Sequence, residues 1–579
     1  MSVDFETEYA STSAVKNISF EVNRKEIVAV VGESGSGKSV TSLSILKLLQ
    51  SPPAKYATGE ILFSKNGDTQ INLLKLSEKE MRDIRGNEIA MIFQEPMTSL
   101  NPVQTCGSQV MEAIRLHEKT NTTSAKKKTI ELFEQVQLPD PVNILNRYPH
   151  QLSGGQKQRV MIAMAMSCNP SLLIADEPTT ALDVTVQKTI LQLIKNLQQQ
   201  HEMGVIYITH DLSLVAEIAD KVIVMYKGSV VEAGSVKEIF LKAQHPYTKA
   251  LLACRPVLHS KGERLPVVSD FLHEDKVNSQ WSIVNSREEK NKLITSDIGH
   301  QTSDIQSSTP ILKVQNLKVY FPIKKNFFGK TLLEFKAVDD VSFEIMKGET
   351  VGLVGESGCG KTTLGRALIG LIEPKAGKIL FSHMGSFGEG KDIAHIEKRE
   401  MRRMRKDIQI IFQDPYGSLN PRITIGSAIQ EPMKIHGLLQ SNKERKDKVM
   451  ELLEKVNLKP EHFNRYPHEF SGGQRQRICI ARALGLNPDF LICDESVSAL
   501  DVSVQAQVLN LLNDLKKEFG FTSIFISHDL SVVRYISDRI IVMNKGKIIE
   551  TGTSDEVYFN PKNEYTKKLI ASIPKGLVA

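Results

Sequence analysis

The feature that most constrains this chain is an internal duplication, because five motifs occur twice in the same order. The paired segments are Ala14–Val22 with Ala337–Ile345, Val31–Ser39 with Val354–Thr362, Phe93–Pro102 with Phe412–Pro421, Arg147–Arg159 with Arg465–Arg477, and Ile208–Ser213 with Ile526–Ser531. Lys38 and Lys361 lie 323 residues apart, and Ser153 and Ser471 lie 318 residues apart. A register this constant means that one domain is duplicated, and the period is far too long for a solenoid.

A polar segment separates the two copies. Residues 257–309 are rich in Ser, Asn, Asp and Lys, and they carry six basic and eight acidic residues, a net charge of −2. Such a composition buries too little apolar surface to form a core, so it predicts a linker. We therefore predict one domain over residues 1–256, a polar linker over 257–309 and a second domain over 310–579.

The composition argues against several classes of protein. Of the 579 residues, 41% are hydrophobic and 24% are charged, which is ordinary for globular domains. No stretch reaches the roughly 18 apolar residues of a membrane helix, and the acidic start, MSVDFETEYA, lacks the pattern of a secretory signal. A net charge of +6 is small for this length and argues against a nucleic-acid partner. The six cysteines contain no CxxC pair, so they predict reduced thiols.

Short apolar segments in each half run directly into the repeated motifs. Ile27–Val31 and Thr350–Val354 precede glycine-rich loops, Leu172–Ala175 and Leu491–Cys493 precede Asp-Glu, and Val205–Ile208 and Ile524–Ile526 precede a His-Asp pair. Unbroken apolar strands between helical stretches are typical of a buried, mainly parallel sheet with helices on both faces. The predicted fold class is therefore α/β, present twice.

Each glycine-rich loop fits the phosphate-binding pattern GxxxxGK[ST]. The glycines let backbone N–H groups converge on phosphate oxygens at the start of a helix, whose dipole favours anions. The lysine would reach the β- and γ-phosphates of a nucleotide, and the last hydroxyl would contact Mg²⁺. The candidate residues are Gly32, Glu33, Ser34, Gly35, Ser36, Gly37, Lys38 and Ser39 in the first half, and Gly355, Glu356, Ser357, Gly358, Cys359, Gly360, Lys361 and Thr362 in the second.

An acidic pair follows a buried strand in each half, Asp176-Glu177 and Asp494-Glu495. The first carboxylate can hold Mg²⁺, and the second can position or deprotonate a water molecule that attacks the γ-phosphate. Acidic pairs on their own are common at solvated surfaces, but their place after an apolar strand in both halves favours catalysis. We predict that Glu177 and Glu495 are catalytic and that Asp176 and Asp494 are metal ligands.

A third motif, SGGQ, precedes a basic helical stretch in each half. Its residues are Ser153, Gly154, Gly155 and Gln156 in the first half, and Ser471, Gly472, Gly473 and Gln474 in the second. A serine followed by two glycines at a helix start makes a second backbone nest for an anion. A helix N-cap would explain the serine, but it would not explain Gly-Gly-Gln or its recurrence.

The order of these motifs resembles that of ATP-binding cassette (ABC) ATPases. The resemblance covers essentially the whole chain outside the linker, and it implies two tandem P-loop domains. Each would have a mainly parallel sheet, an antiparallel β portion and a helical subdomain. In that family ATP lies between the phosphate loop of one domain and the SGGQ of the other. The resemblance therefore implies two composite sites for ATP and Mg²⁺, one pairing Lys38 with Ser471 and the other pairing Lys361 with Ser153.

The remaining roles of the family map onto single residues. The resemblance implies that Gln94 and Gln413 contact Mg²⁺, that His210 and His528 contact the γ-phosphate, and that Asp183 and Asp501 face the other domain. An aromatic residue usually stacks on adenine near the start of such a domain. Phe5 and Phe321 align there, with Tyr320 as a competitor in the second half, although aromatic residues on early strands usually belong to the core.

The sequence departs from the family pattern at three places. Ser496 replaces the proline after Asp-Glu, and Phe470 replaces the leucine before SGGQ, but neither change removes a reacting group, so we expect both sites to hydrolyse ATP. Cys359 lies in the second phosphate loop, where a small residue that fits is favoured over a thiol activated by the helix start. The first half lacks a counterpart of residues 311–316, so either its first strand is short or its start is misassigned.

Two further patterns narrow the resemblance. The glutamine of each half lies in the pattern FQ(E/D)PxxSLNP. The first half ends with HPYTKALL and the second half ends with NEYTKKLI. Both patterns resemble the ATPases of bacterial peptide, nickel and glutathione importers. This implies an ATPase at the cytoplasmic face of the membrane, with two integral membrane permease subunits as partners and a substrate-binding lipoprotein as an indirect one. Some relatives carry a cysteine cluster for iron and sulfur, but only Cys254 lies in that region here, so no cluster is predicted.

The main alternative is a soluble tandem ABC ATPase that acts on the ribosome as a translation factor. Such proteins carry a long, basic, helical arm between their domains. The segment between the halves here is net negative and lacks helical periodicity, which disfavours RNA contact. A DNA-repair ATPase fits less well, because no zinc-type cysteine sets or long heptad repeats interrupt the domains. The sequence does not identify the transported cargo.

Overall fold

The computed structural model describes residues 1–6, 11–65, 67, 69–94, 99–180, 182–272, 310–325, 331–383, 390–498, 500–574 and 576. These residues form two compact units. The first comprises Met1–Ala253, Val268–Leu272 and Pro574, and the second comprises Cys254–Val267 and the described residues from 310 to 573. Among the described residues, no helix is both long and apolar enough to cross a membrane.

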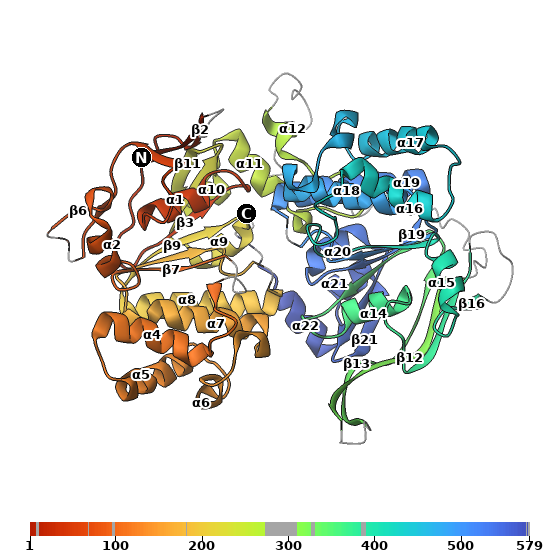
Figure 1. Cartoon of the computed structure of the whole chain (residues 1–579), viewed down its shortest axis with the longest axis horizontal. Coiled ribbons are helices and arrows are strands. Elements are labelled where there is room, and N and C mark those ends of the chain that lie inside the picture. The colour runs from red at the N-terminus through yellow and green to blue at the C-terminus, as the bar shows by residue number, and fades with distance from the viewer. Residues whose placement is uncertain are drawn as a thin grey trace, which may run out of the picture. The chain divides into compact units, whose positions relative to one another are not determined.

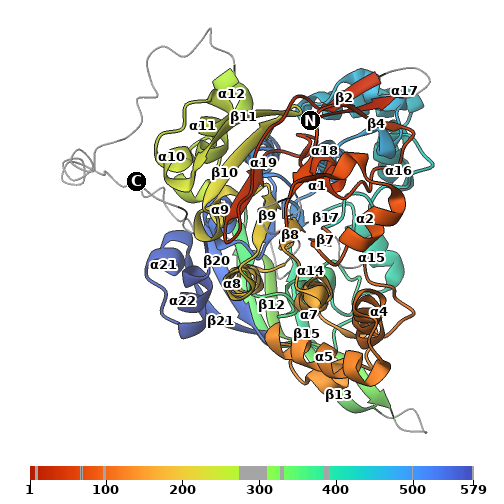
Figure 2. The ribbon, with the colours of Figure 1, turned by 90° about the vertical axis from the view of Figure 1, so that its left-hand side faces the viewer.

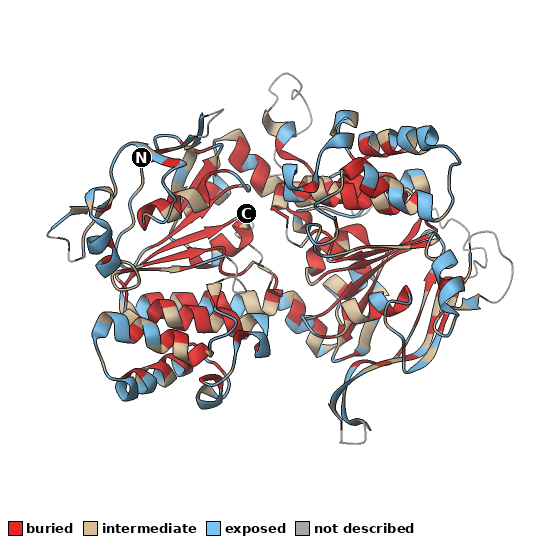
Figure 3. Ribbon diagram, in the orientation of Figure 1, coloured by how far each residue is buried: buried red, intermediate tan, exposed pale blue. Residues whose placement is uncertain are grey.

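A six-stranded sheet forms the core of the first unit, in the order β11-β10-β3-β9-β8-β7. Its strands are β3 (Ile27–Val31), β7 (Ile89–Ile92), β8 (Leu172–Asp176), β9 (Gly204–Thr209), β10 (Lys221–Tyr226) and β11 (Ser229–Ser235). Neighbouring strands are parallel, except that β10 and β11 are antiparallel. Figure 3 shows the central strands as buried, which agrees with their unbroken apolar sequences.

Helices cover both faces of this sheet, with α1 on one face and α8 on the other (Figure 1), and α4, α5 and α6 form a helical subdomain. The helices are α1 (Lys38–Ile45), α2 (Glu78–Ile84), α4 (Cys106–Glu118), α5 (Thr122–Gln135), α6 (Pro141–Ile144), α7 (Gly154–Ala165), α8 (Val184–His201), α9 (Leu212–Ile218), α10 (Val236–Leu241), α11 (Pro246–Ala253) and α12 (Val268–Leu272). Figure 2 shows the same unit from its side.

Antiparallel strands complete the first unit. They are β1 (Ser2–Glu6), β2 (Ser11–Val15) and β4 (Ala54–Thr58), in the order β2-β1-β4, with a separate pair of β5 (Leu62–Phe63) and β6 (Ile71–Asn72). The first strand has 5 residues here, whereas its counterpart in the second unit, β12, has 16. Both sequence-based alternatives, a short first strand and a misassigned start, stay open.

The second unit repeats the order of the core sheet, and it differs in its antiparallel strands, where β16 joins the main antiparallel sheet and no separate pair is formed among the described residues. Its core sheet has the order β17-β18-β19-β14-β20-β21, and its antiparallel sheet has the order β13-β12-β15-β16. The strands are β12 (Pro310–Lys325), β13 (Thr331–Met346), β14 (Thr350–Val354), β15 (Ala376–Phe381), β16 (Lys391–Asp392), β17 (Ile408–Ile411), β18 (Phe490–Asp494), β19 (Thr522–Ile526), β20 (Arg539–Asn544) and β21 (Lys547–Thr553).

The helices of the second unit likewise follow those of the first. They are α14 (Lys361–Leu368), α15 (Lys398–Met404), α16 (Ile425–Ile435), α17 (Asn442–Lys455), α18 (Gly472–Leu484), α19 (Val502–Phe519), α20 (Leu530–Ile536), α21 (Ser554–Phe559) and α22 (Glu564–Ala571). The predicted fold class is confirmed: each repeat has a mainly parallel sheet, an antiparallel β portion and a helical subdomain.

One segment that follows the first repeat belongs to the second unit. This segment, residues 254–267, is called the strap here. The backbone N–H of Leu265 donates to Asn510 Oδ1 at 2.9 Å, and Asn510 Nδ2 donates to the Leu265 carbonyl oxygen at 2.8 Å. The Tyr535 hydroxyl donates to the Glu263 carbonyl oxygen at 2.7 Å. The predicted linker, 257–309, therefore begins in an ordered segment, while its residues 273–309 lie outside the described residues.

Candidate functional site

The phosphate loop of the first repeat connects β3 to α1. Gly37 has φ 100°, and a Cβ atom there would lie 2.7 Å from the carbonyl oxygen of Ala14, so only glycine fits. The Lys38 ammonium donates to the carbonyl oxygens of Gly32 at 2.7 Å and Glu33 at 3.0 Å. The loop therefore closes around its own lysine, which lies at the start of α1.

The second phosphate loop, between β14 and α14, has the same geometry. The Lys361 ammonium donates to the carbonyl oxygens of Gly355 at 2.6 Å and Glu356 at 3.0 Å. Gly360 has φ 109°, and a Cβ atom there would lie 2.1 Å from the carbonyl oxygen of Ala337. The two loops thus agree in glycine placement and in the lysine contacts.

A hydroxyl and a carboxylate meet beside each loop, as a Mg²⁺ site requires. Ser39 Oγ donates to Asp176 Oδ1 at 3.3 Å, and Thr362 Oγ1 donates to Asp494 Oδ1 at 3.1 Å. Burial raises the pKa of both aspartates. A hard cation with oxygen ligands fits this pair, because its charge would stabilise a carboxylate that burial destabilises.

The glutamate after each aspartate is held by three side chains in the first repeat. Glu177 Oε2 accepts from Gln94 Nε2 at 3.0 Å and from Thr180 Oγ1 at 3.0 Å, and it lies 3.3 Å from His210 Nδ1. Burial alone would raise its pKa, but the hydrogen bond and charge of His210, with Lys38 nearby, hold that pKa well below its usual value. The carboxylate is therefore ionised at neutral pH.

Glu495 has the equivalent glutamine and histidine in the second repeat, whereas the Ser498 hydroxyl, at the place of Thr180, donates to the Glu495 carbonyl oxygen at 2.9 Å. Its Oε2 accepts from Gln413 Nε2 at 2.8 Å and lies 3.6 Å from His528 Nδ1. Its pKa is also lowered, because the histidine and Lys361 outweigh burial. The structure thus brings together the predicted Gln, Glu and His of each repeat, and their roles toward ATP stay predictions.

The SGGQ residues begin helices. The Ser153 side chain caps α7, Gln156 bonds back to the Ser153 backbone, and Ser471 and Gln474 do the same for α18. A Cβ atom at Gly155 would lie 2.8 Å from Val186, so the second glycine allows close packing of α7. Local structure therefore explains the glutamine and the second glycine as well as the serine, and the predicted contact with ATP stays a prediction.

The two candidates for adenine stacking lie in different surroundings. Phe5 is partly buried against the core of the first unit, whereas Phe321 is 39% exposed and pairs across the sheet with Phe335. Tyr320, the competitor, donates its hydroxyl to Asp339 and carries the Lys375 ammonium 4.9 Å from its ring centre. One ring face of Tyr320 is thus occupied, while both phenylalanines stay predictions.

Cys359 is buried beside the second phosphate loop. Burial raises its pKa, although Lys361 opposes this effect. This direction favours a small residue that fits the loop over a thiol activated by the helix start, and the role of Cys359 stays a prediction. All six cysteines are free thiols, and Cys254 is buried.

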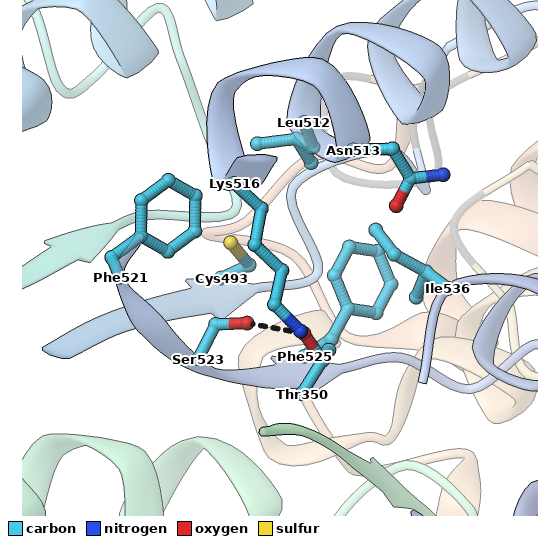
Figure 4. A pocket seen from close by; sticks show the side chains of 9 residues that line it. All are labelled: Thr350, Cys493, Leu512, Asn513, Lys516, Phe521, Ser523, Phe525 and Ile536. Carbon is cyan, nitrogen blue, oxygen red and sulfur yellow. Dashed lines mark hydrogen bonds between the residues drawn. The ribbon is translucent and has the colours of Figure 1, made fainter. Parts of the chain in front are cut away.

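Two other features lie at the amino ends of the core strands, away from the motifs. A small cavity next to Thr350 and Ser523 is shown in Figure 4, and the partly buried Lys516 ammonium beside it donates to Thr350 Oγ1 at 2.7 Å. His383 forms an ion pair with Asp489, and with Asp407 these could offer ligands to a metal ion. The first repeat has a Lys65–Glu88 ion pair at the corresponding place, so ion pairing accounts for this cluster.

Sequence reasoning missed two tyrosines that contact the phosphate loops. The Tyr247 and Tyr565 hydroxyls accept the backbone N–H groups of Glu33 and Glu356. The signal was present in the sequence, since both tyrosines lie in the repeated pattern HPYTKALL and NEYTKKLI. Their contact with the loops could not be inferred, because it joins segments more than 200 residues apart.

Comparison with known proteins gives matches to two family models and to whole proteins. Residues 15–180 and 338–498 match "ABC transporter", and residues 231–271 and 549–576 match "Oligopeptide/dipeptide transporter, C-terminal region". The glutathione import ATP-binding protein GsiA of Salmonella choleraesuis is 49% identical, over 99% of this chain and 88% of that protein. The protein of the same name from Pectobacterium atrosepticum is 48% identical over the same shares.

Among solved structures, a dimeric ATP-binding cassette bound to ADP and Pi is 27% identical to this chain. It covers 42% of this chain and 98% of its own, with a TM-score of 0.37.

Proposed function

Because this chain belongs to the ABC transporter family, we propose that it hydrolyses ATP to energise an importer of glutathione or a related short peptide. The observation that carries this proposal is the 49% identity over 99% of the chain to a glutathione import ATP-binding protein. The matches to the oligopeptide and dipeptide transporter region in both repeats agree with it. Both repeats retain the complete set of loop lysine, hydroxyl, aspartate, glutamate and histidine.

In each site, five side chains would have separate roles in ATP hydrolysis. Ser39 and Asp176 would hold Mg²⁺, which neutralises charge on the phosphates. When ATP binds, the Lys38 ammonium would give up its hydrogen bonds to two loop carbonyl oxygens and donate to phosphate oxygens instead. Glu177 is ionised, so it can orient a water molecule and take its proton, and His210 keeps that carboxylate in place. Thr362, Asp494, Lys361, Glu495 and His528 would do the same in the second repeat.

We further propose that ATP binds in two composite sites, as the resemblance implies. In a chain with Glu495→Gln, the remaining hydrolysis depends on Glu177. Since the proposed pairing places Ser471 in the site of Glu177, Ser471→Ala is expected to lower the hydrolysis rate about tenfold. Ser153→Ala is the matched control, because it removes the same kind of helix cap from the other site. Equal effects of the two serine substitutions would contradict the proposed pairing.

The proposed partners are two permease subunits and, indirectly, a substrate-binding lipoprotein, which would place the chain at the cytoplasmic face of the membrane. A tagged Glu177→Gln, Glu495→Gln chain, held with Mg-ATP, tests this by co-purification from gently solubilised membranes. We expect two multi-span proteins. Recovery of ribosomal subunits would instead support a translation factor and contradict the proposal.

The cargo is tested by uptake in cells that depend on this chain. We expect the Glu177→Gln, Glu495→Gln chain to abolish uptake of labelled glutathione while the unmodified chain supports it. Labelled dipeptides and nickel are measured in parallel, since the family includes importers of each. Normal uptake of all three cargoes with the doubly substituted chain would refute the importer function.

A further inference from the structure

In both repeats, a tyrosine hydroxyl accepts the N–H of the glutamate in the phosphate loop. Tyr247 Oη lies 2.9 Å from the backbone nitrogen of Glu33, and Tyr565 Oη lies 3.0 Å from that of Glu356. The tyrosines lie on α11 and α22, which close the two repeats. The same bond thus occurs twice, between elements that are far apart in sequence.

This bond completes the fixation of the glutamate peptide group. The Glu33 carbonyl oxygen accepts from the Lys38 ammonium at 3.0 Å and from the Ser36 N–H at 3.0 Å. Since the Glu33 N–H is bound by Tyr247, both polar groups of this residue have protein partners. The entry of the phosphate loop is therefore held from inside the protein.

The tyrosine itself is held by its own region of the chain. In the first repeat it is fully buried and its ring centre lies 4.3 Å from that of Tyr226. The Glu232 carboxylate of β11 accepts from the N–H groups of Gln244 at 2.7 Å and His245 at 3.2 Å. His245 Nδ1 in turn accepts from the Tyr247 N–H at 3.2 Å. A chain of contacts thus runs from β11 to the phosphate loop.

The second repeat has the same hydrogen bonds, with Lys562 and Asn563 in the places of Gln244 and His245. The Glu550 carboxylate of β21 accepts from the N–H groups of Lys562 at 2.7 Å and Asn563 at 3.1 Å. Asn563 Oδ1 accepts from the Tyr565 N–H at 2.9 Å, where the first repeat uses a histidine nitrogen. The contact is preserved although the side chain that makes it differs, so the geometry does not depend on one residue type.

We propose that Tyr247 and Tyr565 are positioning residues for ATP binding, through which the closing region of each repeat holds its phosphate loop. These regions, 231–271 and 549–576, are the parts that match oligopeptide and dipeptide transporters. The inference rests on the proposed ATP hydrolysis. Without the hydroxyl, the N–H of the loop glutamate loses this hydrogen bond, and the loop can leave the conformation that binds ATP. The affinity for ATP is therefore expected to fall.

Tyr247→Phe and Tyr565→Phe, singly and together, test this in the full chain. MgATP binding is measured by titration calorimetry in the Glu177→Gln, Glu495→Gln background. We expect each single variant to weaken one of two sites about tenfold and the double variant to weaken both. With the catalytic glutamates restored, kcat at saturating ATP is expected to stay within about twofold, because the reacting groups are untouched.

Tyr226→Phe is the matched control, since it stacks on Tyr247 but leaves the bond to the loop in place. Glu232→Gln acts from the other end of the contact chain, and we expect it to weaken ATP binding less than Tyr247→Phe. Unchanged Kd in both single variants would overturn the proposal. So would a lower unfolding midpoint with unchanged Kd, which would assign the hydroxyl to the fold alone. ATP binding by the unmodified chain, measured first, tests the proposed function separately.

Discussion

In each site, the surroundings shift the pKa values of two adjacent carboxyl groups in opposite directions. Asp176 is buried next to a hydroxyl and its pKa is raised, whereas Glu177 faces His210 and its pKa is lowered. Both Glu177 and Glu495 also have φ 47°, a left-handed conformation that a glutamate rarely adopts. Such strain persists where the surrounding structure fixes a residue, and here it aims the carboxylate at its partners.

The lowered pKa values give a prediction for pH. A glutamate whose folded pKa is below its ordinary 4.5 stabilises the fold above about pH 4.5, and this contribution is lost as the pH falls through the lowered value. We expect Glu177 and Glu495 to remain mostly ionised at pH 4.5. Infrared difference spectra of the unmodified chain and the Glu177→Gln, Glu495→Gln chain measure this. Half-protonation already at about pH 5 would contradict it.

The raised pKa of Cys359 predicts low reactivity. The thiolate is the form that alkylates, and burial disfavours it here. We expect iodoacetamide to modify Cys359 at least about tenfold more slowly than free cysteine at pH 8, as followed by mass spectrometry of the peptide. Faster modification than free cysteine would show that the loop opens or activates the thiol.

At the scale of elements, the second glycine of SGGQ sets how closely two helices pack. A Cβ atom at Gly473 would lie 2.3 Å from Val504 Cγ1, so alanine there forces α18 away from α19. We expect Gly473→Ala to destabilise its unit by about 1–3 kcal/mol, seen as a lower unfolding midpoint. Gly472→Ala is the control, since nothing lies within 4 Å of its added Cβ. Equal midpoints for the two variants would disprove this packing argument.

The sequence predicted three core strands in each repeat, because each of these is an unbroken apolar run that ends in a motif. Ile27–Val31 illustrates this, since all its residues are buried and the phosphate loop follows directly. The chemistry of the motifs assigned both Asp176 and Ser39 to Mg²⁺, and the structure places these two side chains within hydrogen-bond distance. Contacts between distant segments, such as Tyr247 with Glu33, leave no periodic signal and could not be predicted.

At the scale of the whole molecule, the strap shows that the structural units do not follow the repeat boundary. Leu265 is fully buried, and its backbone pairs with Asn510. The first repeat has Gln192 and Glu217 at the positions of Asn510 and Tyr535. The second unit is therefore complete only with residues 254–267, which precede the second repeat.

This arrangement predicts the effect of one buried charge. Leu265→Asp is expected to expel the strap and to raise hydrogen exchange of α20, whose Tyr535 contacts it, by about tenfold or more. Leu258→Asp is the matched control, since Leu258 lies in the same segment and is 47% exposed. Hydrogen exchange followed by mass spectrometry of the full chain gives the comparison. Unchanged exchange of α20 in Leu265→Asp would mean that the strap does not support this helix.

The strap also sets an order of events during synthesis. Leu265 and Asn510 are separated by 245 residues, and ribosomes add roughly 5–20 residues per second. About 10–50 s therefore pass between the synthesis of Leu265 and that of Asn510 on α19. Throughout that time the strap, already translated, lacks the helix against which Leu265 is buried. The second unit therefore finishes folding only after α19 has been synthesised and Asn510 has bonded to the strap.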